Sequence, residues 1–371
     1  MKILFTGGGT AGHIIPIIAI AREIRKSFPN EPFDFYYTGP KDKFAANLLA
    51  KEGIEARWIL TGKIRRYFSL KNVFDILKMP IGLLQAFYHT FVLSPDIIFS
   101  KGGYGSIPVV ISGWILITPI FIHESDISPG LANRIASRFA LEVFTAFPAE
   151  RVEYFPPDKM ISVGNPLRQE ILKTNGESAK KLLGLTGAKP IILFLGGSQG
   201  SQRINDVLLI ILSDLLSGFE IIHQTGEDNF NQVLSEANAT VKKQLIKYYH
   251  PFPFLADKEL ACAYQSADLV ISRAGAGSLF EIAALQKPAI LVPLSESAQN
   301  HQVKNSYFFA EKGGAIVVEE ANFKPRFLLE KIKALFAEPE RLKFMKKKIK
   351  EMARPGASRI VAEYIENYLN Q

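Results

Sequence analysis

The chain has 371 residues and a single cysteine, with 44 lysines and arginines against 36 acidic residues, which gives a formal net charge of +8. This length exceeds one ordinary hydrophobic core and fits two domains, and the lone cysteine excludes a disulfide framework and favours a reducing compartment. The longest apolar stretch, 107–122, is too short and too broken by Pro108, Gly113 and Pro119 to span a bilayer. We expect a helix followed by a strand there.

Short β-branched segments alternate with helical patterns along the whole chain, which is typical of parallel sheets. In chain order, the expected strands are 2–6, 33–38, 54–60, 96–100, 119–123 and 142–146, then 190–195, 219–224, 268–272, 289–293 and 315–318. We therefore predict an α/β protein with two Rossmann-like parallel-sheet domains facing a cleft. The predicted domains are 1–163 and 164–354, with a last helix, 355–371, packing back on the first.

A weak internal repeat supports two similar halves. Residues 96–106 (DIIFSKGGYGS) align without gaps on residues 268–278 (DLVISRAGAGS), and five of the eleven positions are identical. The halves also open alike, with KILFTGGG from residue 2 and IILFLGGS from residue 191. Ligands of open parallel sheets bind beyond the carboxyl ends of the strands. The glycine turns after these strands are therefore candidate binding sites.

Part of the positive charge is concentrated between residues 63 and 79, where cations alternate with apolar residues. The residues concerned are the cations Lys63, Arg65, Arg66, Lys71 and Lys78 and the apolar Ile64, Phe68, Leu70, Val73, Phe74 and Leu77. Such a mixture is typical of a segment lying on an anionic membrane surface. The alternative is an amphipathic helix with a buried apolar face and a solvated basic face. No nucleic-acid-binding motif accompanies these cations, so we expect no nucleic acid as partner.

The first glycine loop, GGGTAGH at residues 7–13, matches the dinucleotide-binding pattern. That pattern also needs an acidic residue at the end of the next strand, but the segment 33–38 ends in Thr38 and Gly39, which argues against NAD or FAD. Backbone N–H groups at a helix N-terminus still suit an anion such as a diphosphate. His13, at the start of the helix, is a candidate general base, or a residue that only caps or packs.

Three more glycine loops follow expected strands, at residues 101–106 in the first half and at 196–201 and 273–278 in the second. Two loops in each half suit a cleft that holds a diphosphate from both sides. No metal or other cofactor is expected, because the sequence has no DxD dipeptide, HExxH motif or Cys/His cluster.

Without a metal, the charge of a leaving nucleotide must be met by helix dipoles and cations. Arg168, after the Asn165-Pro166-Leu167 segment, is a candidate cation, with an ordinary surface arginine as the alternative. Glu281, one turn into the helix after the fourth loop, either caps that helix or accepts hydrogen bonds from ribose hydroxyls.

Taken together, the motifs resemble a bacterial family, the transferases that add N-acetylglucosamine to undecaprenyl-diphosphoryl-N-acetylmuramoyl-pentapeptide (lipid I) and so form lipid II. The resemblance runs in order over nearly the whole chain, through GGTAGH at 8–13, GGY at 102–104, HE at 123–124, PGLAN at 129–133, GNPLR at 164–168, GGSQG at 196–200, SRAG at 272–275, EIAA at 281–284 and HQ at 301–302. It implies the GT-B fold and an inverting transfer from UDP-N-acetylglucosamine to the C4 hydroxyl of lipid I in peptidoglycan synthesis. It also implies a peripheral protein at the cytoplasmic face of the plasma membrane, with the segment 63–79 as its contact with anionic lipid.

The resemblance also implies which residues bind the two substrates. The expected contacts of UDP-N-acetylglucosamine are Thr10, Ala11, Gly12, Asp126, Arg168, Ser198, Ala276, Gly277, Ser278, Leu279, Phe280, Glu281 and Gln302. The acceptor diphosphate is expected at Gly9, Gly102, Gly103 and Tyr104. Glu281 would hold the ribose and Gln302 the sugar or the diphosphate, while His13 matches a histidine proposed to act as base or to position the acceptor.

The chain departs from the family pattern in two places. The fourth loop has Ala276-Gly277-Ser278 where many members have Ala-Leu-Thr, which is tolerated if backbone groups make the contacts. The family usually has His-Glu-Gln-Asn where this chain has His-Glu-Ser-Asp, so Asp126 replaces an asparagine that contacts the donor sugar. An ionised aspartate accepts hydrogen bonds but donates none. Asp126 therefore changes this contact or serves as an alternative base. The uracil-binding segment near 252–255 aligns poorly and is not placed to the residue.

Three other functions share parts of the pattern. A UDP-N-acetylglucosamine 2-epimerase has the same two-half architecture and would form its product without an acceptor. A transferase acting on another lipid, such as diacylglycerol, and a non-catalytic nucleotide-sugar-binding partner of a membrane enzyme are the other two. Glycine loops in both halves argue against the last, since a binding partner needs only one.

Overall fold

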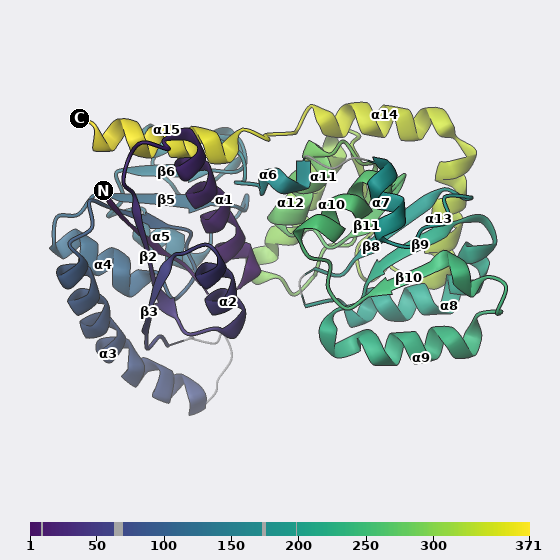
Figure 1. Cartoon of the computed structure of the whole chain (residues 1–371), viewed down its shortest axis with the longest axis horizontal. Helices are drawn as coiled ribbons and strands as arrows, with labels where there is room; N and C mark the ends of the chain where they lie inside the picture. Colours follow the sequence, from purple (N-terminus) through teal and green to yellow (C-terminus); the bar gives the residue numbers. More distant parts are fainter. Residues whose placement is uncertain (9, 63–69, 173–175, 198) are drawn as a thin grey trace. The chain divides into compact units, whose positions relative to one another are not determined.

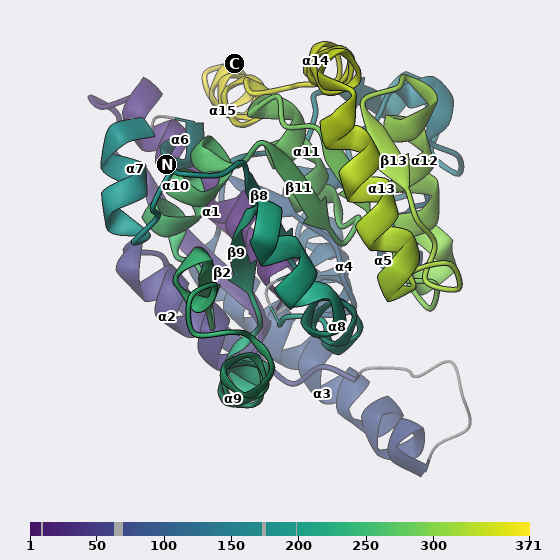
Figure 2. The same ribbon diagram turned by 90° about the vertical axis from the view of Figure 1, so that its right-hand side faces the viewer.

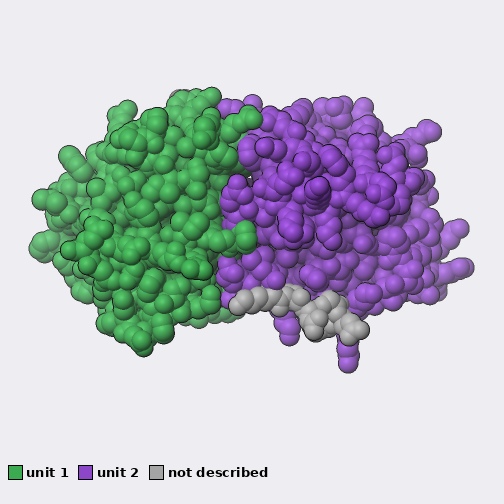
Figure 3. All heavy atoms as spheres, turned by 90° about the horizontal axis from the view of Figure 1, so that it is seen from above, with its two compact units in different colours: residues 1–167, 355–371 green, residues 168–354 purple. Residues whose placement is uncertain are grey.

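The computed structural model describes residues 1–8, 10–62, 70–172, 176–197 and 199–371 (Figure 1). The chain divides into two compact units, Met1–Leu167 with Pro355–Gln371 and Arg168–Arg354, which are coloured separately in Figure 3. Each unit is built on one parallel sheet, of seven strands in the first and six in the second. The predicted α/β class with two Rossmann-like sheets is confirmed.

The first sheet has the strand order β3-β2-β1-β4-β5-β6-β7. Its strands are β1 (Lys2–Thr6), β2 (Asp34–Pro40), β3 (Glu55–Ile59), β4 (Ile97–Ser100), β5 (Ile120–Glu124), β6 (Glu142–Thr145) and β7 (Met160–Ser162). The order reverses between β1 and β4, so the turns after these two strands are neighbours. A hydrogen bond of 2.9 Å from the Gly8 N–H to the Gly102 carbonyl joins the two turns.

The helices of the first unit cover both faces of its sheet. They are α1 (Ala11–Ser27), α2 (Lys43–Lys51), α3 (Leu70–Leu93), α4 (Ile107–Ile115), α5 (Leu131–Ala136) and α15 (Ala357–Leu369), with short 3-10 turns at Ala149–Arg151 and Pro157–Lys159. α1, α2 and α15 share one core with the buried Phe5 and Phe99. α15 comes from the far end of the chain, packs along α1 and donates from the Tyr364 hydroxyl to Glu142 at 3.1 Å (Figure 1).

The second sheet has the order β10-β9-β8-β11-β12-β13 and reverses between β8 and β11. Its strands are β8 (Ile191–Leu195), β9 (Glu220–Gln224), β10 (Tyr249–Phe252), β11 (Leu269–Ser272), β12 (Ala289–Leu291) and β13 (Ala315–Val317). The α-helices are α6 (Gln169–Leu172), α7 (Gly176–Leu182), α8 (Gln202–Gly218), α9 (Phe230–Thr240), α10 (Asp257–Ser266), α11 (Ala276–Ala284), α12 (His301–Glu311), α13 (Pro325–Ala337) and α14 (Pro339–Lys350). α8, α9 and α13 pack apolar side chains on the same face of this sheet (Figure 2).

Two strands were not predicted from the sequence. β7 has only three residues and lies at the edge of the first sheet, and β10 lies at the edge of the second and contains Pro251. Both are too short or too irregular to show a strand pattern, and proline is tolerated at an edge because no neighbour needs its N–H. The 107–122 stretch forms α4 and the start of β5, as expected.

The boundary between the units lies after Leu167, four residues beyond the predicted one. The reason is visible in two hydrogen bonds within the first unit. His123 Nε2 lies 2.9 Å from the Gly164 carbonyl, and the Ser125 hydroxyl donates to Asn165 Oδ1 at 2.7 Å. These bonds hold the segment 164–167 on the first sheet.

The internal repeat corresponds to the same structural position in each sheet. Asp96 accepts a hydrogen bond from the Lys2 N–H at 2.6 Å, and its counterpart Asp268 accepts one from the Ile191 N–H at 2.8 Å. In both units the repeat thus joins the central strand to its neighbour and then enters a glycine loop. Among the residues that the structure describes, no helix has the length and apolar character needed to cross a membrane.

Candidate functional site

In the first unit, the turn after β1 brings His13 against two glycine loops. Thr10 precedes α1, and its Oγ1 lies 2.8 Å from His13 Nδ1. A Cβ atom on Gly103 would lie 3.2 Å from His13 Nε2, so the free edge of the imidazole faces the second loop. Burial, with the nearby Lys101 charge, lowers the pKa of His13 to about 4. The imidazole is therefore uncharged near neutral pH.

Lys101, the first residue of the second loop, is a buried cation that sequence reasoning did not select. Its side chain is 3% exposed, and its ammonium group donates to the Ser125 hydroxyl. Burial lowers the pKa of Lys101 to about 8, while the carboxylates of Glu124 and Asp126 act in the opposite direction. The available signal was a lysine directly after a predicted buried strand and directly before two glycines.

Two carboxylates lie next to this lysine, Glu124 at the end of β5 and Asp126 just after it. Glu124 is buried and accepts hydrogen bonds from the Asp126 N–H at 3.0 Å and from Asn133 Nδ2 at 2.9 Å. Burial and the Asp126 charge raise the pKa of Glu124. Asp126 itself is half-buried. The structure therefore collects His13, Lys101, Glu124 and Asp126 in the first unit; the sequence had singled out His13 and Asp126.

The second loop supports this cluster through its backbone. Gly102 and Gly103 have φ angles of 87° and 85°, in the left-handed region that favours glycine. A Cβ atom on Gly102 would lie 2.5 Å from Asn133 Oδ1, so a larger residue there would displace the amide that binds Glu124. Tyr104, also predicted to meet the acceptor, is 42% exposed. Gly9 lies outside the described residues.

The predicted membrane-contact residues are only partly visible. Lys63, Ile64, Arg65, Arg66 and Phe68 lie outside the described residues, as do the side chains of Leu70, Lys71, Val73, Phe74 and Leu77 in α3. Lys78 is described and exposed.

In the second unit, the loop after β8 and the loop after β11 are tied together by Arg273. Its guanidinium donates to the Ser201 hydroxyl at 2.9 Å and pairs with Glu320 at 2.6 Å. Gly200 has a φ angle of 77°, and a Cβ there would lie 2.1 Å from the Thr225 carbonyl. The predicted donor contact Ser198 lies outside the described residues.

The N-terminus of α11 is open. Gly275 is the N-cap residue, no side chain caps the helix, and Cβ atoms on Gly275 or Gly277 would meet nothing within 4 Å. The first backbone N–H groups of a helix have no partner inside it, so such an end suits an anion. Leu279 and Phe280, predicted as donor contacts, have buried side chains that pack in the core. Only their backbone is available for such a contact.

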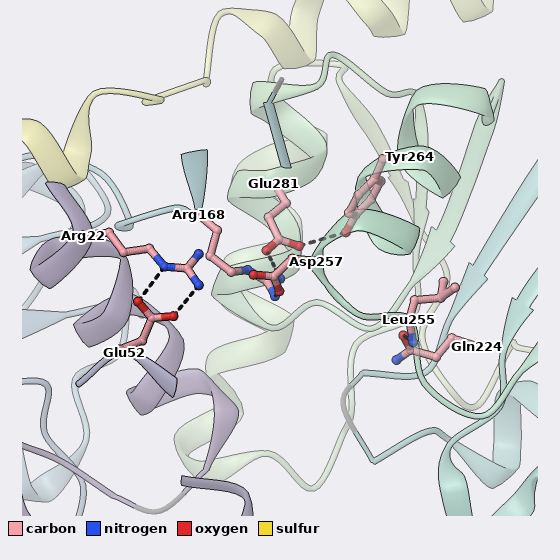
Figure 4. A network of polar contacts seen from close by, with 8 residues as sticks. All are labelled: Arg22, Glu52, Arg168, Gln224, Leu255, Asp257, Tyr264 and Glu281. Carbon is pink, nitrogen blue, oxygen red and sulfur yellow. Dashed lines mark hydrogen bonds and ion pairs between the residues drawn. The ribbon is translucent and has the colours of Figure 1, made fainter. Parts of the chain in front are cut away.

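A buried ionic network lies further along α11 (Figure 4). Arg168 pairs with Glu281 at 3.0 Å and also with Asp257, and the Tyr264 hydroxyl donates to Glu281 at 3.2 Å. The two carboxylates outweigh the burial of Arg168 and raise its pKa. The structure brings the predicted residues Arg168 and Glu281 together, but the arginine charge is already met by carboxylates. Arg168 is therefore better placed to orient Glu281 than to neutralise a phosphate.

Two glutamines of the second unit, the predicted UDP-N-acetylglucosamine contact Gln302 and Gln224, each accept a hydrogen bond from a backbone N–H. Gln302, the second residue of α12, accepts a hydrogen bond from the Leu294 N–H at 3.0 Å. Gln224, at the end of β9, accepts one from the buried Leu255 N–H at 3.1 Å and so fixes the 252–255 segment (Figure 4). Within the described ranges, no group of three or more His, Cys, Asp or Glu side chains is arranged to hold a metal ion.

Comparison with known proteins places these features in a family. The model of the glycosyltransferase family 28 N-terminal domain matches residues 3–145, and that of the C-terminal domain matches residues 191–360. UDP-N-acetylglucosamine–N-acetylmuramyl-(pentapeptide) pyrophosphoryl-undecaprenol N-acetylglucosamine transferase 2 of Bacillus cereus is 38% identical over 94% of this chain and 95% of its own length. The Clostridium tetani enzyme of the corresponding name is 36% identical over 99% of this chain and 98% of its own.

Solved structures agree. The crystal structure of Acinetobacter baumannii MurG superposes with a TM-score of 0.73 at 25% identity, covering 99% of both chains. A Neisseria meningitidis UDP-N-acetylglucosamine 2-epimerase superposes with a TM-score of 0.68 over 99% of this chain and 100% of its own, but its 15% identity shows a common fold alone. Both domain models and relatives of more than one third identity span nearly the whole chain: it belongs to glycosyltransferase family 28.

Proposed function

We propose that this chain transfers N-acetylglucosamine from UDP-N-acetylglucosamine to the C4 hydroxyl of a lipid-diphosphate-linked N-acetylmuramyl-pentapeptide, the reaction that forms lipid II. The observation that carries the proposal is the full-length likeness to curated transferases of that name. The epimerase alternative has only a common fold to support it. The transferase function also fits the glycine loops that end the central strands of both sheets.

The donor is assigned to the second unit. The open N-terminus of α11 supplies backbone N–H groups for the diphosphate. Glu281, held by Arg168 and Tyr264, has lone pairs to spare for ribose hydroxyls, because an ionised carboxylate offers about four acceptor positions. As UDP leaves, negative charge grows on its β-phosphate, and preorganised N–H groups stabilise charge that develops in the transition state.

The acceptor and the general base are assigned to the first unit. The C4 hydroxyl oxygen attacks C1 of the donor sugar, the bond from C1 to the β-phosphate oxygen breaks, and UDP keeps the electron pair. Attack from the opposite face converts the α-linked donor into a β-1,4-linked product. The hydroxyl proton must go to a base, and His13 and Asp126 are the candidates.

Electrostatics favour Asp126 over His13. Burial lowers the pKa of His13, and the nearby Lys101 charge adds to the effect, so protonating this imidazole is costly. Protonating Asp126 removes one of two neighbouring carboxylate charges, and like charges at one site repel. We therefore assign Asp126 as the base and His13 as an uncharged hydrogen-bonding partner of the acceptor.

A membrane-docking surface is proposed on α3 and α4. The large exposed apolar side chains there are Met79, Ile81, Leu84, Tyr88, Phe91 and Val92 of α3 and Trp114, Ile115 and Ile117 at the end of α4. Both helices run from the carboxyl end of one strand to the start of the next, so their C-terminal residues lie at the same edge of the sheet. Exposed apolar residues gathered in this way mark an interaction surface. Because the proposed acceptor is linked to a lipid, we propose that this surface binds the cytoplasmic face of the plasma membrane.

Vesicle sedimentation tests the docking surface. Leu84 is 71% exposed, and so is Ile210 on α8 of the second unit. On vesicles containing anionic lipid, Leu84→Ser combined with Phe91→Ser should weaken binding at least about tenfold, since each removes apolar area from the interface. Ile210→Ser is the matched control and should bind as the unchanged protein does. Equal binding by all three proteins would remove α3 from the docking surface.

The transfer assay tests the function. Purified protein is supplied with radiolabelled UDP-N-acetylglucosamine and a short-chain lipid I analogue, with and without EDTA. Label should move to the analogue in both cases, because proton removal and charge stabilisation are assigned to side chains and backbone. If this protein transfers no label while a control enzyme is active in the same assay, the proposed function is wrong. If label is transferred without EDTA but not with EDTA, the metal-independent mechanism is wrong.

A further inference from the structure

Lys101 is a buried charge that the proposed reaction has not yet used. A Cβ atom on Gly7 would lie 3.3 Å from His13 Cβ and 3.5 Å from Lys101 Cβ, so the two side chains leave the backbone side by side. The ammonium group donates to Ser125, the residue between Glu124 and Asp126. A buried ammonium is costly unless it is paired. This one is placed where it acts on both candidate bases.

The titratable groups that interact electrostatically with Lys101 are His13 of α1, His123 and Glu124 of β5, and Asp126 just after β5. Tyr37 of β2 bonds to Gly7, which lies beside Lys101. Burial lowers the pKa of His123 far below its usual value and raises that of Tyr37, whose hydroxyl donates to the Gly7 carbonyl. These two side chains are therefore uncharged near neutral pH. The charges that remain are those of Lys101 and the two carboxylates.

Removing the lysine charge would change the balance in a definite direction. The two carboxylates would face each other without a cation, which favours protonation of one of them. The imidazole of His13 would lose its neighbouring positive charge and accept a proton more readily. Both changes would oppose proton removal by Asp126.

We propose that Lys101 is a positioning residue for the transfer reaction: its ammonium charge offsets the charges of Glu124 and Asp126, adds to the cost of protonating His13, and so directs the acceptor proton to Asp126. The inference rests on the proposed function, since it concerns the same hydroxyl proton. Lys101 keeps its own protons throughout the step and contacts neither reacting atom. Its backbone position is held independently, by an N–H donated to the Thr6 carbonyl at 2.8 Å.

The charge of Lys101 can be kept or removed by substitution. An arginine stays charged over the whole range in which the activity is measured, so Lys101→Arg keeps the charge and Lys101→Met removes it.

The first experiment compares Lys101→Arg and Lys101→Met with the unchanged protein, by kcat/KM for the short-chain acceptor from pH 5 to 10. Lys101→Arg should keep at least about a tenth of the activity at pH 7, with its acid limb in place. Lys101→Met should lose at least about tenfold at pH 7, with its acid limb displaced upward. A uniform loss at every pH, with the acid limb of Lys101→Met in place, is the result of a purely structural role and would overturn the proposal.

A second measurement needs no substrate. The chain has six histidines, and nitrogen-15 resonances of labelled histidine can be followed through an acid titration, with His13→Asn identifying the His13 signal. The His13 midpoint should rise by about one pH unit in Lys101→Met, while that of His223, buried in the second unit, stays unchanged. An unmoved His13 midpoint in a folded Lys101→Met protein would overturn the proposal even if transfer is confirmed. A missing transfer activity with a displaced midpoint would instead overturn the function and leave the charge effect standing.

Discussion

The two units contain the same sequence repeat and put it to different uses. Lys101 and Arg273 occupy equivalent positions, each donating its backbone N–H to the end of the central strand, at 2.8 and 3.2 Å. Arg273 is held by Glu320 and Ser201, so its guanidinium group joins two loops. Lys101 instead reaches Ser125, beside a pair of carboxylates. Arg273 therefore joins two loops, whereas Lys101 is proposed to act on the transfer of the acceptor proton.

The loops that follow differ as well. Gly102 and Gly103 adopt positive φ angles and turn back over His13, whereas Gly275 has a φ angle of −66° and leads directly into α11. The first unit therefore closes its loop around buried charge, and the second leaves a helix N-terminus open. We propose that a common βαβ frame supports proton transfer in one unit and anion binding in the other, and the following predictions test that division.

The largest effect is expected at Asp126. Asp126→Asn keeps the shape of the side chain but removes the proposed base, and general bases contribute about 100-fold or more to a rate. We expect kcat to fall at least about 100-fold, with the affinity for UDP-N-acetylglucosamine changed far less. Steady-state kinetics and donor titration measure the two quantities. Asp158→Asn, at an exposed position of the same unit, is the matched control and should have no effect.

A smaller effect is expected at Arg168, where the KM for the donor should change more than kcat. Arg168→Met leaves Glu281 and Asp257 without their cation, and removing one partner of a buried ion pair costs about 3–5 kcal/mol. The KM for UDP-N-acetylglucosamine should rise at least about 30-fold, while kcat at saturating donor falls less than in Asp126→Asn. Asp257→Asn alters the more exposed partner and should have a weaker effect. An unchanged donor KM would contradict a ribose contact oriented by this network.

At the open N-terminus of α11, we expect one substitution to raise stability and to lower the affinity for UDP. Gly275 has space for a side chain and a backbone conformation that suits an N-cap aspartate. Gly275→Asp should stabilise the second unit by roughly a few tenths of a kcal/mol and weaken UDP binding about tenfold, because the carboxylate competes for the same N–H groups. Gly275→Asn caps without a charge and separates the two effects. Thermal unfolding and UDP titration measure them; tighter UDP binding by Gly275→Asp would exclude α11 as the diphosphate site.

The smallest effect concerns stability in acid. Burial lowers the pKa of His223 to about 3, so the unfolded chain takes up a proton below about pH 6.5 while the folded unit does not. The unfolded state then binds more protons, and stability falls as pH falls. We expect His223 to cost the second unit about 1 kcal/mol between pH 6.5 and 5.5. Urea unfolding of the unchanged protein and of His223→Asn tests this: the variant should show a shallower pH dependence, and an equal slope would contradict it.

Much of the fold could be predicted from local patterns, because β-branched runs and glycine turns are visible in the sequence. The short edge strands β7 and β10 were not predicted. The candidate site was less visible. Lys101 lies near His13 and the two carboxylates only because β1, β4 and β5 are neighbours in the sheet. Arg168 contacts Glu281, which is 113 positions away in the sequence. Such pairings depend on tertiary packing, which periodicity does not reveal. Leu279 and Phe280 fall on the buried side of α11, so only their backbone remains a candidate contact.

The most direct test of the account is to measure donor binding and turnover together in Asp126→Asn and Arg168→Met. The account predicts that Asp126→Asn binds UDP-N-acetylglucosamine normally but does not transfer it in a single turnover, whereas Arg168→Met transfers once its weakened donor site is saturated. It would be contradicted if saturating donor restored turnover to Asp126→Asn, because Asp126 would then not be the base.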